Sequence, residues 1–165
     1  MKAIVVYESL WGNTAAIARA IAEGIGPEAR ALSTAEATAA VTIGADLMVA
    51  GAPVMAFKLP SYKLRKGLAH PKDKNLTPPD LSHPPMRSWL STLPRSQGHA
   101  AAFDTQFKWL PNIATSTIIR KLEQAGYRIV AKPQHFIVNG TLGPLAEGEL
   151  ERAKAWGGDL AKLAK

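Results

Sequence analysis

The sequence predicts an α/β domain in which a parallel sheet is covered by helices on both faces. Short apolar runs rich in Val, Ile and Ala alternate along the chain with segments whose apolar residues recur at helical spacing. This alternation is typical of parallel sheets, because the crossover between two parallel strands is usually a helix. The chain has 165 residues and no internal repeat, which suits one domain with its own core. We therefore expect a single domain over residues 1–165.

The first strand and the first helix are the most clearly marked elements. The run KAIVVYES (2–9) is rich in β-branched residues and too short for a buried helix, so it predicts a central strand. From Thr14 to Ile25 the apolar residues follow the period of a helix. The Gly-Pro pair at 26–27 ends this helix.

The elements that follow are more weakly marked. A short strand is expected at 29–32. In the sequence STAE, Ser33 and Glu36 have the spacing of a capping box, which predicts the start of a short second helix. The run ADLMVAGAPV (45–54) is apolar almost throughout and predicts another buried strand.

Residues 55–85 show neither a helical period nor a strand period. The stretch HPKDKNLTPPDLSHPP in this range combines prolines with charged residues, so we expect a long loop. Compact domains rarely keep such loops without a use. The sequence leaves open a disordered surface excursion and a functional lid.

The second half of the chain continues the alternation. Gly126 ends one predicted helix, Pro133 interrupts the last predicted strand, and a Gly-Gly pair at 157–158 weakens the last predicted helix. In chain order, the predicted elements are a short helix at 86–93, a strand at 99–105, a helix at 114–124, a strand at 127–138 and a helix at 145–165.

A polar turn, SLWGNT (Ser9–Thr14), connects the first strand with the first helix. Ligands of such sheets bind beyond the carboxyl ends of the strands, where the strand order reverses. The free N–H groups and the positive dipole end of a helix favour an anion, and Gly12 lets the backbone curl around it. The turn therefore predicts a phosphate site, held by neutral hydrogen bonds because it contains no Lys or Arg. The alternative is a helix start capped by Asn13 or Thr14 alone.

Several other chemistries lack their residues. The sequence has no Gly-x-x-x-x-Gly-Lys-Ser/Thr and no Gly-x-Gly-x-x-Gly after the first strand, which argues against nucleotide hydrolysis and dinucleotide binding by these motifs. It has no cysteine, so any redox chemistry requires a bound cofactor. The histidines show no metal-ligand spacing, and nothing marks Glu8 or Asp104 as a general base, so we predict neither a metal nor a catalytic residue.

The segment VVYESLWGNTAAIARAI (5–21) resembles the flavodoxin signature, in which an apolar strand leads through a phosphate loop into the first helix. This resemblance implies a flavodoxin-like three-layer sandwich with a five-stranded parallel sheet in the order 2-1-3-4-5. It also implies flavin mononucleotide (FMN) as cofactor, held by this loop and by loops after the third and fourth strands, here 51–60 and 103–112. The stretch at 136–157 also resembles the C-terminal end of flavodoxin-domain proteins from actinobacteria.

The resemblance further implies which residues hold the cofactor. Phe57 with Trp109 or Phe107 would sandwich the isoalloxazine ring, unless these aromatics only anchor their loops. Carried over residue by residue, the predicted set is Ser9, Leu10, Trp11, Gly12, Asn13 and Thr14 for the phosphate, Pro53, Val54, Met55, Ala56 and Phe57 for one side of the ring, and Asp104, Thr105, Phe107 and Trp109 for the other.

The function implied by the resemblance is electron transfer through the bound flavin, by a carrier or by a small FMN-dependent oxidoreductase. Flavodoxins commonly place a flexible glycine peptide next to the ring, whereas APVMAF (52–57) has none, and positive φ is disfavoured without glycine. We therefore expect electrons to move in pairs, which fits a reductase better than a carrier. The alternative is a binding module that keeps the fold, lacks the cofactor and acts through a basic surface.

The net charge of +7 favours acidic partners, whereas electron-carrier flavodoxins are typically acidic themselves. Cations gather within 58–74, where they would attract an anionic redox partner protein or an NAD(P)H-type reductant, or would form only a solvated loop. No motif predicts specific nucleic-acid binding. The apolar runs are too short to span a membrane and no signal peptide is evident, so we expect a cytoplasmic protein without membrane insertion.

Overall fold

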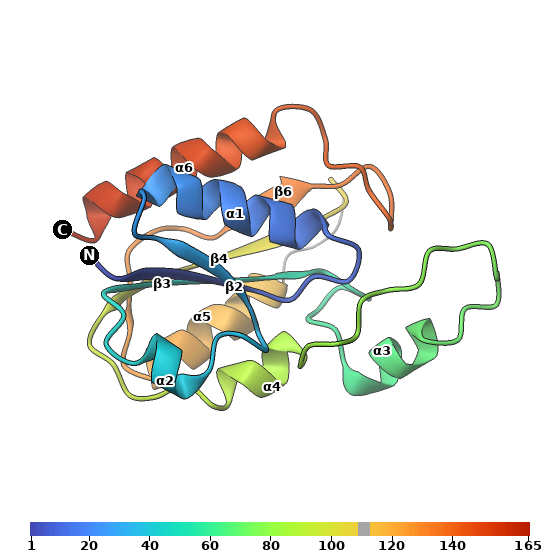
Figure 1. The fold of residues 1–165 in the computed structure, drawn as a ribbon, viewed down its shortest axis with the longest axis horizontal. Coiled ribbons are helices and arrows are strands. Elements are labelled where there is room, and N and C mark those ends of the chain that lie inside the picture. Colours follow the sequence, from blue (N-terminus) through green and yellow to red (C-terminus); the bar gives the residue numbers. More distant parts are fainter. Residues whose placement is uncertain (109–112) are drawn as a thin grey trace.

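A parallel sheet forms the centre of the computed structural model, which describes residues 1–108 and 113–165 (Figure 1). The strand order is β2-β1-β3-β4-β5, β6 also pairs with β4, and all these pairings are parallel. The predicted order 2-1-3-4-5 is therefore confirmed. The strands are β1 (Ala3–Tyr7), β2 (Arg30–Ser33), β3 (Leu47–Pro53), β4 (His99–Gln106), β5 (Arg128–Ile129) and β6 (Gln134–Ile137).

Two short strands share the fifth position of the sheet. β5 pairs with the start of β4, and β6 pairs with its end. Pro133 lies directly before β6, and a proline has no N–H to donate to a neighbouring strand. The interruption predicted within 127–138 is thus present, and β6 carries the chain to the carboxyl edge of the sheet.

Helices cover both faces of the sheet, as the sequence predicts. α1 and α6 lie on one face and α2, α4 and α5 on the other, while α3 projects beyond the carboxyl edge (Figure 1). α4 and α6 are shorter than predicted. The helices are α1 (Asn13–Ile25), α2 (Ala39–Thr42), α3 (Tyr62–Leu68), α4 (Met86–Leu90), α5 (Ala114–Gln124) and α6 (Glu149–Leu163).

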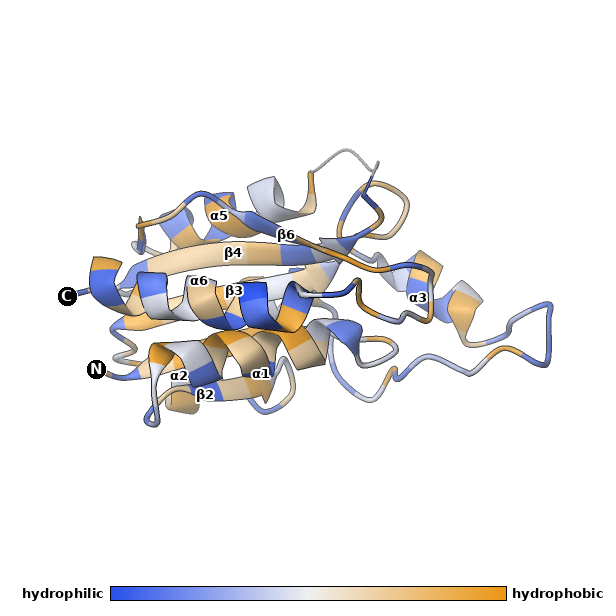
Figure 2. Ribbon diagram, turned by 90° about the horizontal axis from the view of Figure 1, so that it is seen from above, coloured by the Kyte–Doolittle hydropathy of each residue, from blue (hydrophilic) through white to orange (hydrophobic). Residues whose placement is uncertain are grey.

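The central strands supply a hydrophobic core to each face of the sheet. Ala3 and Val5 pack in the core beneath α1 and α6, whereas Ile4 and Val6 pack in the opposite core. Successive strand residues point to opposite faces, so one continuous apolar run serves both cores. In Figure 2, β3 and β4 are mostly apolar along their length, whereas the covering helices carry both apolar and polar residues.

The capping box predicted at STAE forms, but it does not begin a helix. A Glu36 carboxylate oxygen accepts the Ser33 N–H at 2.8 Å, and Ser33 Oγ accepts the Glu36 N–H at 3.3 Å. These hydrogen bonds close a turn, and α2 begins only at Ala39. The predicted helix start is therefore wrong, because reciprocal capping also stabilises an isolated turn.

The range 55–85 contains a helix that the sequence analysis did not predict. Ser61 Oγ accepts the Leu64 N–H at 3.2 Å and caps α3. α3 has only 7 residues, too few to establish an apolar period against the surrounding prolines and lysines. The prediction of a loop over the whole range is wrong at this helix.

The Gly-Gly pair lies inside α6 without interrupting it. A Cβ on Gly157 would clash with the carbonyl oxygen of Ile21 in α1, and a Cβ on Gly24 would clash with that of Lys154 in α6. The two helix backbones can approach this closely only because neither position has a side chain. Gly157 thus lowers the helix propensity of α6 but permits close packing of α6 against α1.

Candidate functional site

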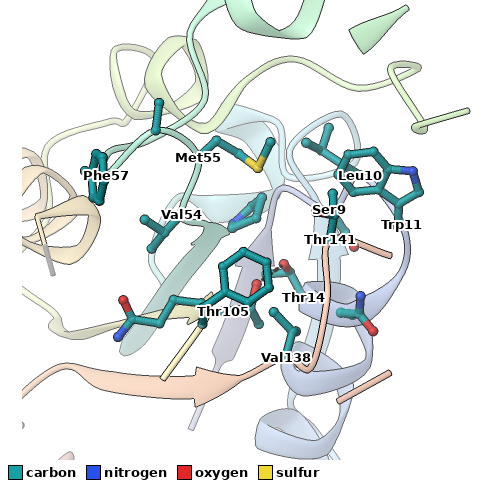
Figure 3. Close-up of a pocket in the computed structure, with 15 residues that line it drawn as sticks. Ser9, Leu10, Trp11, Thr14, Val54, Met55, Phe57, Thr105, Val138 and Thr141 are labelled. Carbon is teal, nitrogen blue, oxygen red and sulfur yellow. Dashed lines mark hydrogen bonds between the residues drawn. The ribbon is translucent and has the colours of Figure 1, made fainter. Parts of the chain in front are cut away.

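A pocket of about 230 Å³ opens beyond the carboxyl ends of β1, β3 and β4, where the strand order reverses. Figure 3 shows Phe57 and Trp11 on opposite sides of it, with Met55 between them. The lining residues are Ser9, Leu10, Trp11, Asn13, Thr14, Pro53, Val54, Met55, Ala56, Phe57, Thr105, Gln106, Phe107, Val138 and Thr141.

The turn between β1 and α1 curls back on itself beside the pocket. Ser9 Oγ accepts the Gly12 N–H at 3.1 Å, and Gly12 has a φ of +93°, which favours glycine. No side chain caps α1 in the described part of the chain, so the alternative of a helix start capped by Asn13 or Thr14 is wrong. The positive end of α1 and its first N–H groups thus stay available to an anion.

A pair of hydroxyls joins this turn to the neighbouring strand. Thr14 Oγ1 and Thr105 Oγ1 are 2.8 Å apart, and both residues are buried. This hydrogen bond fixes the start of α1 against the end of β4. The two predicted loops to which these residues belong therefore meet at the floor of the pocket.

The loop after β3 forms a tight hairpin at the pocket rim. Met55 and Lys58 exchange backbone hydrogen bonds of 2.8 and 3.1 Å, and the two residues between them have positive φ, +49° for Ala56 and +64° for Phe57. The lack of glycine in APVMAF (52–57) predicted that such a backbone is disfavoured. The hairpin hydrogen bonds hold two left-handed residues there nevertheless, with the Phe57 side chain half exposed.

The segment from Lys58 to Pro85, which we call the arm, is fastened to the turn between β1 and α1. The Ser9 N–H donates to His83 Nε2 at 3.2 Å, the Asp80 N–H donates to the Leu10 carbonyl at 2.7 Å, and Trp11 Nε1 donates to the Thr77 carbonyl at 2.9 Å. These bonds support the outer side of the turn that lines the pocket.

A buried ion pair anchors the arm more deeply. Arg65 Nη1 lies 2.7 Å from Glu8 Oε1, and Glu8 Oε2 accepts the Met86 N–H at 2.9 Å. Burial raises the pKa of the Glu8 carboxyl, while the Met86 N–H and the Arg65 guanidinium counteract part of that rise. Glu8 and Arg65 therefore hold the arm in place, and neither lines the pocket.

His83 is a buried residue of the arm and acts as a hydrogen-bond acceptor. Burial lowers the pKa of its imidazole, the nearby Arg65 guanidinium lowers it further, and Asp80 opposes this. A neutral ring is what the geometry requires, because Nε2 needs a free lone pair to accept the Ser9 N–H.

Asp104 is buried away from the pocket, although it was predicted beside the ring. Its Oδ2 lies 2.9 Å from His135 Nδ1 on the adjacent β6. Burial raises the pKa of Asp104, and the hydrogen bond with His135 opposes that rise. Thr105 and Gln106, nearer the end of β4, line the pocket, whereas Asp104 lies further back in the strand and pairs with His135.

The structure brings most of the predicted site residues to one pocket. Gly12 is exposed beside the pocket as the residue before α1, and Trp109 lies outside the described residues. Those that line the pocket are Ser9, Leu10, Trp11, Asn13, Thr14, Pro53, Val54, Met55, Ala56, Phe57, Thr105 and Phe107.

The sequence analysis missed Gln106, Val138 and Thr141. The last two belong to a loop closed by an antiparallel bridge between Val138 and Leu145. Gly143 in this loop has a φ of +99°, and a Cβ there would clash with the Asn13 side chain. The NG and GP pairs of VNGTLGP mark this turn in the sequence, but its position beside α1 depends on β6.

Gln106 differs from the other lining residues in its hydrogen bonding. Its side chain is 94% buried, and Oε1 has no partner among the residues that the structure describes. Buried amides are nearly always hydrogen-bonded, so this atom needs an explanation.

Residues 1–108 and 113–165 contain no group of three or more His, Cys, Asp or Glu that could hold a metal ion. None of the helices in these ranges is both long enough and apolar enough to cross a membrane.

Comparison with known proteins identifies the architecture. No protein-family model and no curated protein sequence matches this chain. A flavodoxin from the domain Archaea superimposes with a TM-score of 0.69 at 22% identity, covering 99% of both chains. Oxidised flavodoxin 1 from Bacillus cereus gives 0.68 at 18% identity and 98% coverage of both. A WrbA-like flavodoxin from Agrobacterium tumefaciens gives 0.60 at 21% identity, covering 98% of this chain and 96% of that one.

The fold and the pocket together define a doubly wound α/β protein with a pocket at its switch point. More particularly, the chain has the flavodoxin-like fold, as the resemblance of its first strand and turn implied.

Proposed function

We propose that this protein binds FMN in the pocket and transfers electrons through it. The observation that carries the proposal is an uncapped helix N-terminus beside a largely apolar pocket at the switch point. FMN has a phosphate at one end and a planar, mostly apolar ring at the other. The first N–H groups of α1 suit the phosphate, and the apolar lining suits the ring.

Different residues would contact different parts of the cofactor. Ser9, Asn13 and Thr14 would hold the phosphate with the N–H groups of α1, without a cationic side chain. Met55 and Phe57 would border one side of the ring, and Phe107 would border another. Bound FMN supplies the redox chemistry, and the surrounding residues set its orientation and exclude water from part of it.

The test compares two flavins that differ only in the phosphate. We expect the protein to quench the fluorescence of added FMN on binding, and to bind riboflavin much more weakly. Thr14→Ala removes a hydroxyl next to the phosphate and should weaken FMN binding by about 1 to 3 kcal/mol while leaving the weak riboflavin binding unchanged. Equal affinities for FMN and riboflavin would overturn the phosphate site, and no binding of either would favour a binding module without cofactor.

We further propose an anionic redox partner, either an acidic protein or an NAD(P)H-type reductant. The arm begins at Lys58, directly after Phe57 at the pocket rim, and α3 presents Lys63 and Lys66 to solvent. Tyr62 beside them is 70% exposed. Arg65 does not contribute, because it is buried against Glu8. Exposed cations around a redox site accelerate encounters with anions at low salt.

Small oxidants of opposite charge test this surface. With the flavin reduced, we expect anionic ferricyanide to react faster as salt is lowered, and cationic hexaamminecobalt(III) to react more slowly. The double substitution Lys63→Glu with Lys66→Glu should reduce this difference. Lys162→Glu with Lys165→Glu, the same charge change at the C-terminal end of the chain on the far side of the molecule from α3, should not. Equal effects of the two changes would show that only net charge matters.

Carrier and reductase are separated by two measurements. Steady oxidation of NADPH by the FMN-loaded protein alone favours a reductase, and its absence favours a carrier. The predicted preference for paired electrons is tested by anaerobic reductive titration.

A further inference from the structure

A second groove, of about 660 Å³, lies within the arm. It runs between α3 and the segment 81–85, which returns from the tip of the arm toward α4 (Figure 1). Among the described residues, it shares no lining residue with the pocket at the switch point. Its volume is in the range of small-molecule sites, roughly 300 to 1,000 Å³. We call it the arm groove.

The two walls of the arm groove are held together at its floor. Arg65 of α3 and His83 of the returning segment both line the groove, and both are buried. Arg65 Nη2 donates to the His83 carbonyl at 2.5 Å, and Arg65 Nη1 lies 2.7 Å from Glu8 Oε1. Because Glu8 directly follows β1, these contacts fix the groove against the sheet. The groove is therefore formed before any ligand enters it.

Two exposed lysines line the α3 wall. Lys63 and Lys66 are at positions i and i+3 of α3, so their side chains are neighbours on the helix surface. Neither ammonium has an ion-pair partner in residues 1–108 or 113–165, and no Asp or Glu of these ranges lines the groove. Like charges at this spacing repel each other, and an anion between them offsets that repulsion. The pair therefore suits a group with more than one negative charge, such as a phosphate monoester.

An aromatic ring lies beside the two lysines. Tyr62 also lines the groove, and it is 70% exposed. Exposed aromatic rings offer a stacking surface to planar bases, whatever the identity of the base. Pro84 and Pro85 supply apolar surface on the opposite wall. The arm groove thus combines a surface for a planar ring with two cations for a phosphate.

A phosphorylated adenosine has both of these parts. Its purine base is planar, and a phosphate on its ribose carries close to two negative charges at neutral pH. Dinucleotide sites that take an unphosphorylated ribose commonly place a carboxylate at its 2′-hydroxyl, whereas sites for a 2′-phosphate place a cation there. The described lining of the arm groove has cations and no carboxylate. An acidic segment of a partner protein would pair with the lysines but would leave Tyr62 without a role.

We infer that the arm groove binds the 2′-phosphoadenosine end of an NADPH-type dinucleotide. Tyr62 stacks on the adenine ring, and Lys63 and Lys66 bind the 2′-phosphate. The arm begins directly after Phe57 at the pocket rim, so the groove belongs to the segment that adjoins the proposed flavin site. As a site for a reductant, the groove rests on the proposed function, whereas its preference for the phosphorylated dinucleotide depends only on its own residues.

The test measures equilibrium binding of NADP⁺ and NAD⁺ by calorimetry at low salt, with the protein as purified and again after addition of FMN. We expect NADP⁺ to bind about tenfold more tightly than NAD⁺, because only NADP⁺ carries the 2′-phosphate. Lys63→Gln with Lys66→Gln should remove this difference. Tyr62→Leu should weaken the binding of both dinucleotides about tenfold and leave the difference between them unchanged.

The matched control is Lys72→Gln with Lys74→Gln, which removes the same charge from the same arm at positions that do not belong to the described lining of the groove. It should leave the preference for NADP⁺ unchanged. An equal loss of preference in both double variants would overturn the inference, because only net charge would then matter.

Two further outcomes would overturn the inference without any variant. One is equal affinity of the unaltered protein for NADP⁺ and NAD⁺. The other is binding of a poly-glutamate peptide without binding of NADP⁺, which would assign the groove to an acidic partner protein. Binding of FMN with either of these results leaves the proposed function standing. A preference for NADP⁺ in a protein that does not bind FMN supports the nucleotide site and overturns the proposed function.

Discussion

Ala56 and Phe57 adopt a left-handed backbone that residues with a Cβ rarely adopt. Each such residue costs about 1 to 2 kcal/mol relative to glycine or to an ordinary conformation. Because the two lie at the pocket rim, the hairpin carries strain at the place where a ligand would touch it. We therefore expect substitutions there to affect stability and binding separately.

Ala56→Gly should stabilise the protein. Glycine adopts positive φ without strain but loses more conformational freedom on folding, so the expected net gain in the free energy of unfolding is about 0.5 to 1 kcal/mol. Ala155→Gly makes the same change at an exposed position in α6 and should destabilise by about 1 kcal/mol. Urea unfolding measures both, and a loss of stability in Ala56→Gly would contradict the strained hairpin.

His83 should make stability depend on pH. Its pKa is lowered in the folded state, below the ordinary value of 6.5. As pH falls below about 6.5, the unfolded chain therefore takes up a proton that the folded chain does not. Stability should decrease with falling pH across that window, by at most about 1.4 kcal/mol per pH unit, and level off below the folded pKa.

A variant isolates the contribution of His83 from that of the other titrating groups. In His83→Gln the amide oxygen can still accept the Ser9 N–H, but it does not titrate near neutral pH. We expect a flatter profile of unfolding free energy between pH 5 and 7 in this variant. Identical profiles would show that folding does not lower the pKa of His83.

For single residues, the sequence identified most of those that line the pocket but missed Gln106, Val138 and Thr141. The turn Ser9–Thr14 could be predicted to border the pocket because its residues are contiguous in the sequence. Asp104 was misplaced because it lies within β4, which continues to Gln106, and is paired with His135 of β6. Gln106 could not be singled out, because the lack of a hydrogen-bond partner for its Oε1 among the described residues depends on tertiary packing around the end of β4.

Among the elements, the contact between α1 and α6 depends on glycine. A Cβ at Gly157 would meet the backbone of α1, so Gly157→Ala should force the helices apart and destabilise by about 1 to 3 kcal/mol. Gly67→Ala in α3 is the matched control, because a Cβ there has open space. It should stabilise by up to about 1 kcal/mol through helix propensity. Chemical denaturation of both variants checks the difference in sign.

Elements with a strong period were predictable, and those made by local hydrogen bonding were not. α1 and α5 follow their apolar pattern to within a residue. α3 and the turn at Ser33 depend instead on local hydrogen bonds of capping side chains, which act alike in turns and short helices. The Gly-Gly pair was judged by propensity, whereas packing against α1 decides its effect.

For the whole molecule, the alternation of elements and one turn were enough to predict the strand order. Parallel strands with helical crossovers allow few arrangements, and the resemblance at 5–21 chose among them. The attachment of the arm could not be predicted in this way. It depends on Arg65 and His83 meeting Glu8 and Ser9 across a long sequence separation, and no local pattern reports such pairs.

The hydrogen bonds that attach the arm should slow the exchange of the amide protons that make them. The amide protons of Ser9, Asp80 and Met86 all lie in the seam between the arm and the turn that follows β1. If the arm lifts as one unit, these three protons should exchange with deuterium at similar rates, faster than the amide of Val49 in the central strand β3. Exchange of Asp80 far ahead of Ser9 and Met86 would show that the arm peels from its tip.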